Sequence, residues 1–183
     1  MLIDVNNATL LVIDVQEKLI PAMADPQGMI ARTRWLLQVA TELGLPTVFS
    51  EQYPKGLGTT LAELTEVASG ARVVEKMHFS CVGAQCLPED LLLREQVIVC
   101  GMETHICVLQ TVLDLRSLGK QVFVVEDATA CRSLASQTAG IQRMRDSGAQ
   151  IVTREMVVFE CLRSANHEKF RLISKTFLVG EQP

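Results

Sequence analysis

The sequence contains a carboxylate, an amine and a thiol at positions where the three could act together. Asp14 closes the apolar run that begins at Leu10, Lys76 follows the run that begins at Arg72, and Cys107 lies where a helical pattern starts. A thiol in the first turn of a helix faces the positive end of the helix dipole, which favours the thiolate and lowers the thiol pKa. A carboxylate can take up the thiol proton, and a lysine can stabilise the developing negative charge. These residue types indicate nucleophilic catalysis by a cysteine.

Each of the three residues also has a purely structural interpretation. Considered alone, Asp14 is a turn or cap residue, Lys76 a surface lysine and Cys107 a buried structural cysteine. The elements that position them favour the catalytic interpretation. All three residues are predicted at or just after the carboxyl ends of strands, and these ends meet at one edge of a parallel sheet.

Six short runs of β-forming residues alternate with helical patterns along the chain. Most of them are continuously apolar, which is typical of strands covered on both faces. The runs are Thr9–Asp14, Thr47–Ser50, Arg72–Glu75, Gln96–Cys100, Gln121–Glu126 and Gln150–Thr153. Their alternation with helices predicts an α/β fold of three layers, α/β/α, with a six-stranded parallel sheet. With the strand order 3-2-1-4-5-6, the ligand crevice lies between the first and fourth strands, beside Asp14 and Cys107.

Helical periodicity is clearest in four segments. Apolar residues repeat on one face of three segments, each of which is followed by a glycine, and a fourth helix is expected after a cap at Asn166. The three segments are Met29–Leu43, Thr104–Leu118 and Ser136–Asp146. The segment Glu51–Thr60 is predicted to be a long irregular loop, either functional or a plain surface excursion.

Composition excludes several classes of protein. The chain has 183 residues, of which 48% are hydrophobic, so it is expected to form a single domain over residues 1–183 rather than a disordered chain. A net charge of −4 without a basic run argues against a nucleic-acid partner, and no apolar stretch is long enough to predict a membrane span. The apolar excess, with a mean hydropathy of +0.23, favours a homo-oligomer.

The cysteines and the N-terminus indicate the compartment. Six dispersed cysteines without a C-x-x-C motif are expected to be free thiols, and the N-terminus has no basic region or cleavage site typical of a signal peptide. A cytoplasmic location is therefore expected. The sequence also lacks the G-x-S-x-G and P-loop motifs, and its three histidines are too sparse to predict a metal site.

Three motifs make a family recognisable. The chain resembles the isochorismatase-like cysteine hydrolases, a superfamily that includes nicotinamidases and N-carbamoylsarcosine amidohydrolases. The resemblance rests on Leu11–Gln16 (Leu-Val-Ile-Asp-Val-Gln), on Lys76, and on Gly101–Val108 (Gly-Met-Glu-Thr-His-Ile-Cys-Val). It extends over nearly the whole chain.

The resemblance implies roles for individual residues. Asp14 would be the catalytic acid and base, Lys76 the catalytic lysine and Cys107 the nucleophile. The Met102–Glu103 peptide bond would be cis, and the backbone N–H groups of Glu103 and Cys107 would form an oxyanion hole. The substrate would be a small molecule with an amide, ureido or related C–N bond.

One departure from the family bears on cofactors. Nicotinamidases carry an Asp-x-His metal motif after the second strand, where this sequence has Ser50-Glu51-Gln52-Tyr53-Pro54-Lys55-Gly56. The segment looks like the metal-free isochorismatase-domain branch, so neither a metal nor a cofactor is expected.

The substrate pocket is expected to include Tyr53, Phe79 and His105. Two alternatives to a hydrolase stay open. One is a catalytically inactive binding or scaffold protein of the same fold. The other is a thiol-redox protein, with Cys100 or Cys131 as the resolving cysteine.

Overall fold

Six parallel strands form the centre of the computed structural model, which describes residues 1–178. Their order is β3-β2-β1-β4-β5-β6, so the predicted fold class and strand order are confirmed. The strands are β1 (Ala8–Ile13), β2 (Thr47–Gln52), β3 (Arg72–Lys76), β4 (Gln96–Met102), β5 (Gln121–Ala130) and β6 (Gln150–Val152). Because all six run parallel, their carboxyl ends share one edge of the sheet.

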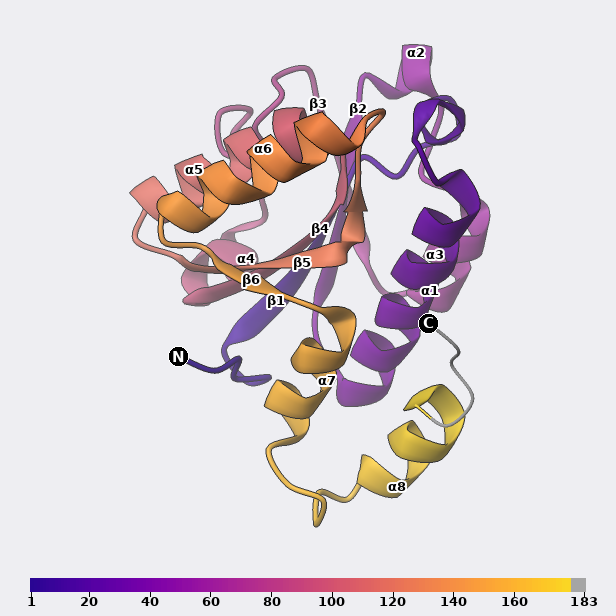
Figure 1. Cartoon of the computed structure of the whole chain (residues 1–183), viewed down its shortest axis with the longest axis vertical. Helices are drawn as coiled ribbons and strands as arrows, with labels where there is room; N and C mark the ends of the chain where they lie inside the picture. Colours follow the sequence, from indigo (N-terminus) through magenta and orange to yellow (C-terminus); the bar gives the residue numbers. More distant parts are fainter. Residues whose placement is uncertain (179–183) are drawn as a thin grey trace.

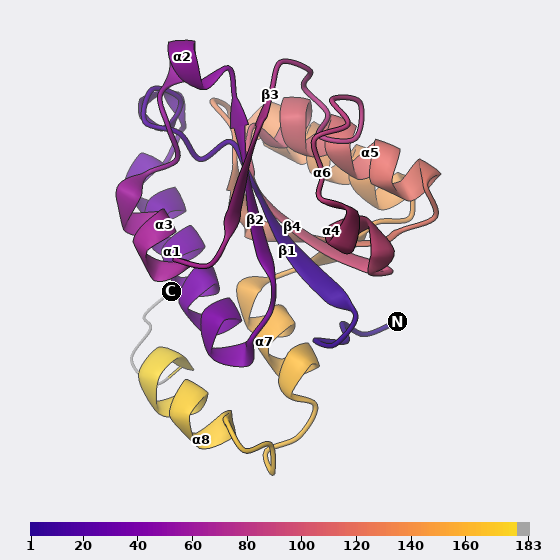
Figure 2. The ribbon, with the colours of Figure 1, turned by 180° about the vertical axis from the view of Figure 1, so that it is seen from behind.

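Helices cover both faces of the sheet (Figures 1 and 2). One face carries α1 (Pro26–Leu43), α3 (Ala62–Val67) and α7 (Arg154–Leu162), with α8 (Phe170–Ile173) beyond them. The other face carries α4 (Glu89–Leu93), α5 (Leu109–Ser117) and α6 (Leu134–Asp146). Shorter helical pieces are α2 (Pro54–Leu57), a 3₁₀ turn at Ile20–Ala22 and π-helical turns at Thr104–Val108 and Ser174–Leu178.

The alternation of side chains along β1 divides the hydrophobic core in two. Leu10 and Val12 belong to the cluster on the α1 side, whereas Leu11 and Ile13 belong to the cluster under α5. All six residues of β1 are buried. A continuously apolar run is therefore required at the sheet centre, as the sequence pattern indicates.

The strand ends differ from the sequence prediction by one or more residues at the edge of the sheet that carries the candidate site, and two of these differences change the local structure. The segment Glu51–Thr60 is not a continuous loop, because β2 continues to Gln52 and α2 follows. β5 extends beyond Glu126 to Ala130, since its pairing with β4 resumes at Gly101 after a register shift.

The helices after β6 also differ from the prediction. The last helix begins at Phe170 after Lys169 and not at Asn166, whose N–H instead donates to Ser164 Oγ in the preceding turn. Helix α7 is not predicted by the periodicity. Its N-cap is Thr153, which accepts a hydrogen bond from the Met156 N–H and which the prediction places at the end of a strand.

Candidate active site

Close approach of β1 and β4 brings the first and fourth strand ends together. Gly101 has φ of +116°, and a Cβ at this position would lie 2.1 Å from the carbonyl oxygen of Ile13. Only glycine can occupy such a position without moving the backbone. Asp14 follows Ile13 in the left-handed region, with φ of 54°, a conformation that aspartate tolerates better than most residues. The turn directs Asp14 into the interior, where it is fully buried.

A buried ion pair joins β1 to β3 across the end of β2. Lys76 Nζ donates to Asp14 Oδ2 at 2.7 Å, and both side chains are 0% exposed. Ser50 Oγ donates to Asp14 Oδ1, also at 2.7 Å. Each carboxylate oxygen therefore has a donor, as a buried charge requires.

Burial and mutual attraction act in opposite directions on this pair. Burial raises the pKa of Asp14 above its ordinary value of 3.8, although Lys76 and Ser50 oppose the shift. Burial tends to lower the pKa of Lys76, but the negative charge of Asp14, followed by the interaction with Cys107, outweighs burial and raises the pKa above 10.5. Lys76 therefore remains charged at neutral pH. The Asp14 carboxylate beside it takes up a proton more readily than the carboxylate of an exposed aspartate does.

The Cys107 thiol interacts with both members of the ion pair. It lies in the π-helical turn that connects β4 to α5, where Asp14 and Lys76 both act on its pKa. Burial, followed by the negative charge of Asp14, raises the pKa of the Cys107 thiol to about 12. The lowered pKa expected from a helix start is wrong, because desolvation of the thiolate outweighs the attraction of Lys76.

The turn before Cys107 is held by a side-chain pair. The peptide bond between Met102 and Glu103 is cis in the structure. The Glu103 carboxylate is buried and accepts two hydrogen bonds from the guanidinium of Arg132, at 2.8 Å from Nε and 2.6 Å from Nη2. Arg132 directly follows the buried Cys131 at the end of β5. This two-point contact fixes the turn to the neighbouring strand.

The end of β2 contributes residues to the site that the sequence motifs do not predict. Gln52 Oε1 accepts from Lys76 Nζ at 2.8 Å, and its Nε2 donates to the Met77 carbonyl at 2.8 Å. The backbone N–H of Gln52 donates to Gln16 Oε1, and the backbone carbonyl of Gln52 accepts from Gln16 Nε2; the Gln16 side chain is buried. Together with Ser50, these residues position the ion pair. The predicted strand order contains a signal for these residues. β2 lies between the strands that carry Asp14 and Lys76, so its carboxyl end must face both.

The expected pocket residues Tyr53, Phe79 and His105 occupy three different places. Tyr53 lines a cavity of about 470 Å³ that Lys76 and Met77 also border. Phe79 is 51% exposed and does not line this cavity. The Nδ1 atom of His105 lies 3.1 Å from the Sγ atom of Cys131. Of the three, Tyr53 lies in a cavity beside the ion pair.

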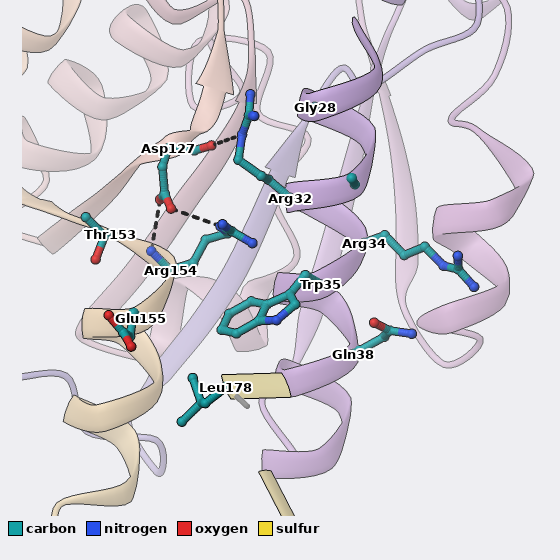
Figure 3. A pocket seen from close by; sticks show the side chains of 11 residues that line it. Gly28, Arg32, Arg34, Trp35, Gln38, Asp127, Thr153, Arg154, Glu155 and Leu178 are labelled. Atoms are coloured by element: carbon teal, nitrogen blue, oxygen red, sulfur yellow. Dashed lines mark hydrogen bonds and ion pairs between the residues drawn. The ribbon is translucent and has the colours of Figure 1, made fainter. Parts of the chain in front are cut away.

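A larger cavity, of about 700 Å³, lies between α1 and α7 (Figure 3). It is lined by none of Asp14, Lys76 and Cys107. Asp127 accepts hydrogen bonds from the backbone N and the Nε of Arg154, both at 2.9 Å. The Arg154 guanidinium lies 4.9 Å from the centre of a Trp35 ring. These contacts tie β5 to two helices and give this region a structural role.

Residues 1–178 contain neither a cluster of metal-binding side chains nor a membrane-spanning helix. Within this range, no group of three or more His, Cys, Asp and Glu side chains is arranged to hold a metal ion. The helices of the same residues include none with the length and apolar character needed to cross a membrane.

The fold and the buried cluster together define a class: a doubly wound α/β protein with an acid, an amine and a thiol at the carboxyl edge of its sheet. The isochorismatase domain model matches residues 8–156. The chain belongs to the isochorismatase family, which is part of a superfamily of hydrolases.

Individual relatives agree with this assignment. Mouse isochorismatase domain-containing protein 2A is 40% identical over 172 residues, which cover 92% of this chain and 82% of the mouse protein. The solved structure of MAR1 ribonuclease from Caenorhabditis elegans is 35% identical, with a TM-score of 0.92 over 100% of this chain and 95% of that one. The YcaC protein of Escherichia coli, described as an octameric hydrolase of unknown specificity, shares the fold at 24% identity, with a TM-score of 0.83 and coverage of 97% and 96%.

Proposed function

We propose that this protein is a cysteine-dependent hydrolase of a small amide, ureido or related C–N substrate, with Asp14, Lys76 and Cys107 as its catalytic residues. The observation that supports it is a fully buried ion pair whose two members act on the Cys107 thiol. Burying two charges is costly and seldom needed for stability alone. Buried, perturbed titratable groups in contact with a thiol are typical of an active site.

In the proposed reaction, Cys107 attacks the carbonyl carbon while Asp14 accepts the thiol proton. A base is needed because the thiol, with a pKa of about 12, is protonated at neutral pH. Asp14 then returns the proton to the leaving nitrogen, and the C–N bond breaks to give an acyl-enzyme. Water deprotonated by Asp14 hydrolyses this intermediate and releases Cys107.

Two further groups stabilise charge in this proposal. Lys76 opposes the rise in the Asp14 pKa and so favours the ionised carboxylate before the thiol is deprotonated. The backbone N–H groups of Glu103 and Cys107 form the oxyanion hole, where one donor is worth roughly 3–4 kcal/mol. The substrate enters beside Tyr53, and a cavity of about 470 Å³ favours a small molecule.

The remaining elements of the proposal concern the whole chain. Residues 1–183 form a single isochorismatase-like hydrolase domain that uses no metal or cofactor, although residues 179–183 lie outside the described part. The protein is cytoplasmic, in agreement with its six free thiols. It assembles as a homo-oligomer, as the E. coli relative is described to do.

The alternatives are less well supported. A scaffold has no physical need for a buried ion pair in contact with a thiol. A redox role for Cys107 requires a resolving cysteine, whereas its described contacts are with Asp14 and Lys76. RNA hydrolysis, which the name of the nematode relative suggests, is disfavoured by a net charge of −4, because RNA binding relies on cationic side chains.

A panel of small amides and ureido compounds tests the proposal. Wild-type protein should hydrolyse at least one compound, Cys107→Ala should not, and Cys161→Ala is the matched control because Cys161 is a buried thiol in the other core cluster. Equal turnover by wild type and Cys107→Ala would exclude Cys107 as the nucleophile. No turnover of any compound would favour the inactive scaffold.

A further inference from the structure

Two cysteines outside the proposed catalytic residues lie against each other in the segment after β3. Cys81 and Cys86 are both free thiols. The carbonyl oxygen of Cys81 accepts hydrogen bonds from both the backbone N and the Sγ of Cys86, at 3.3 and 3.4 Å. Each thiol also shifts the pKa of the other.

The chain turns so that Cys86 returns to Cys81. The Gln85 N–H donates to the Val82 carbonyl, and Gln85 itself has a left-handed φ of 53°. Because the N–H of Cys86 bonds to the carbonyl of Cys81, their Cα atoms come within the roughly 4.4–6.8 Å that a disulfide spans. Formation of a bond between the sulfurs therefore requires side-chain rotation rather than rearrangement of the segment.

One thiol is fixed and the other is accessible. Cys81 is fully buried, and its backbone N–H donates to Thr111 Oγ1 on α5 at 3.1 Å. The preceding Ser80 is held to the same helix through a hydrogen bond to Asp114. Cys86 is only partly buried. An oxidant in solution therefore reaches Cys86 first, and Cys81 is in place to resolve the product.

We infer that Cys81 and Cys86 form a reversible disulfide site that reacts with hydrogen peroxide. In the first step the Cys86 thiolate attacks one peroxide oxygen, the O–O bond breaks, and Cys86 sulfenic acid and hydroxide form. In the second step the Cys81 sulfur attacks the sulfenic sulfur, the S–O bond breaks, and the Cys81 proton leaves with the oxygen as water. The two thiols lose two electrons, peroxide gains them, and a dithiol reductant restores both thiols.

Charges around the pair favour this order of reaction. The hydrogen bond from Cys81 lowers the pKa of Cys86, and the charge of Lys76 lowers it further, whereas burial and Asp14 oppose them. The pKa of Cys81 is raised, first by the hydrogen bond to Cys86 and then by burial. Cys86 is thus the better nucleophile. Ala84, within the loop that the disulfide would close, borders the same cavity as Lys76 and Tyr53, so oxidation would fix one wall of that cavity.

Peptide mapping of the full-length Cys107→Ser variant tests the inference without relying on the proposed hydrolase activity. After treatment with peroxide, a cross-linked peptide joining Cys81 to Cys86 should appear, both residues should resist maleimide labelling of the denatured protein, and dithiothreitol should reverse the change. The additional substitution Cys86→Ser should abolish the cross-link, and Cys161→Ser should not.

Three results would overturn the inference. The first is irreversible oxidation of Cys86 while Cys81 remains a free thiol. The second is a cross-link from either residue to a different cysteine. The third is persistence of both free thiols when Cys161 is already oxidised. None of these results depends on whether a substrate has been found. Failure of the disulfide inference can therefore be distinguished from failure of the hydrolase proposal.

Discussion

Asp14 lies at the centre of the site, because its two carboxylate oxygens are held by Ser50 and Lys76 and its charge acts on Cys107. Asp14→Asn keeps the shape of the side chain but removes the proton acceptor. The turnover number should fall by about 10²–10⁴-fold, the usual contribution of general acid–base catalysis. Steady-state kinetics measures this turnover number on the best substrate of the amide panel, and circular dichroism verifies that the variant is folded. Turnover close to wild type would exclude Asp14 as the base.

The pH dependence of Cys107 alkylation reports the protonation state of the thiol. Since burial and Asp14 raise its pKa to about 12, the rate of reaction with iodoacetamide should still be rising above pH 9.0, the ordinary value for a thiol. Mass spectrometry follows the reaction, with Cys107→Ser to identify the other thiols. A plateau at neutral pH would instead indicate a preformed thiolate.

At the scale of elements, the approach of β1 to β4 depends on Gly101. Gly101→Ala adds a Cβ 2.1 Å from the Ile13 carbonyl at a φ of +116°, so the two strand ends must separate. The free energy of unfolding should fall by at least about 2 kcal/mol, and Asp14 and Cys107 should lose their contact. Denaturant titration measures the loss. Gly70→Ala, with no atom within 4 Å of the added Cβ, should change stability by less than about 0.5 kcal/mol.

The contact of β5 with α7 is the second element-scale feature. Asp127 accepts two hydrogen bonds from Arg154, and its backbone carbonyl accepts a third from Arg32 Nε. Asp127→Ala should lower the free energy of unfolding by about 1–3 kcal/mol. Turnover should not change, because the cavity in Figure 3 is lined by none of the proposed catalytic residues. Asp146→Ala, which removes an exposed hydrogen bond from Gln142 within α6, is the control. Loss of turnover without loss of stability would contradict the structural role.

At the scale of the whole molecule, one edge of the sheet presents apolar side chains. β3 ends the sheet, and Val73, Met77 and Phe79 are exposed on it or just beyond it. Edge strands and apolar surface of this kind are typical of interfaces between subunits. Light scattering at micromolar concentration should give at least twice the chain mass of 20.2 kDa. Val73→Lys should weaken the assembly, whereas the control Leu134→Lys, on α6, should not. A monomeric wild-type protein would contradict the prediction.

Local sequence patterns are sufficient to predict the sheet and the edge at which the candidate site lies. Continuously apolar runs separated by helical patterns require strands covered on both faces, and parallel strands bring their carboxyl ends together. Asp14, Lys76 and Cys107 are therefore predicted at one edge, where the structure pairs Asp14 with Lys76 and both residues act on the Cys107 thiol. This prediction depends only on local hydrophobicity and chain direction, which the sequence carries directly.

The environment of those three residues depends on packing between distant parts of the chain. The pKa of Cys107 depends on how much water the surrounding side chains exclude, and no local pattern specifies that burial. The contacts of Gln52 with Lys76 and of Arg132 with Glu103 join residues far apart in the chain. Their partners are set by strand register and by packing across the sheet. Only the assembled sheet determines which polar side chains meet at its edge.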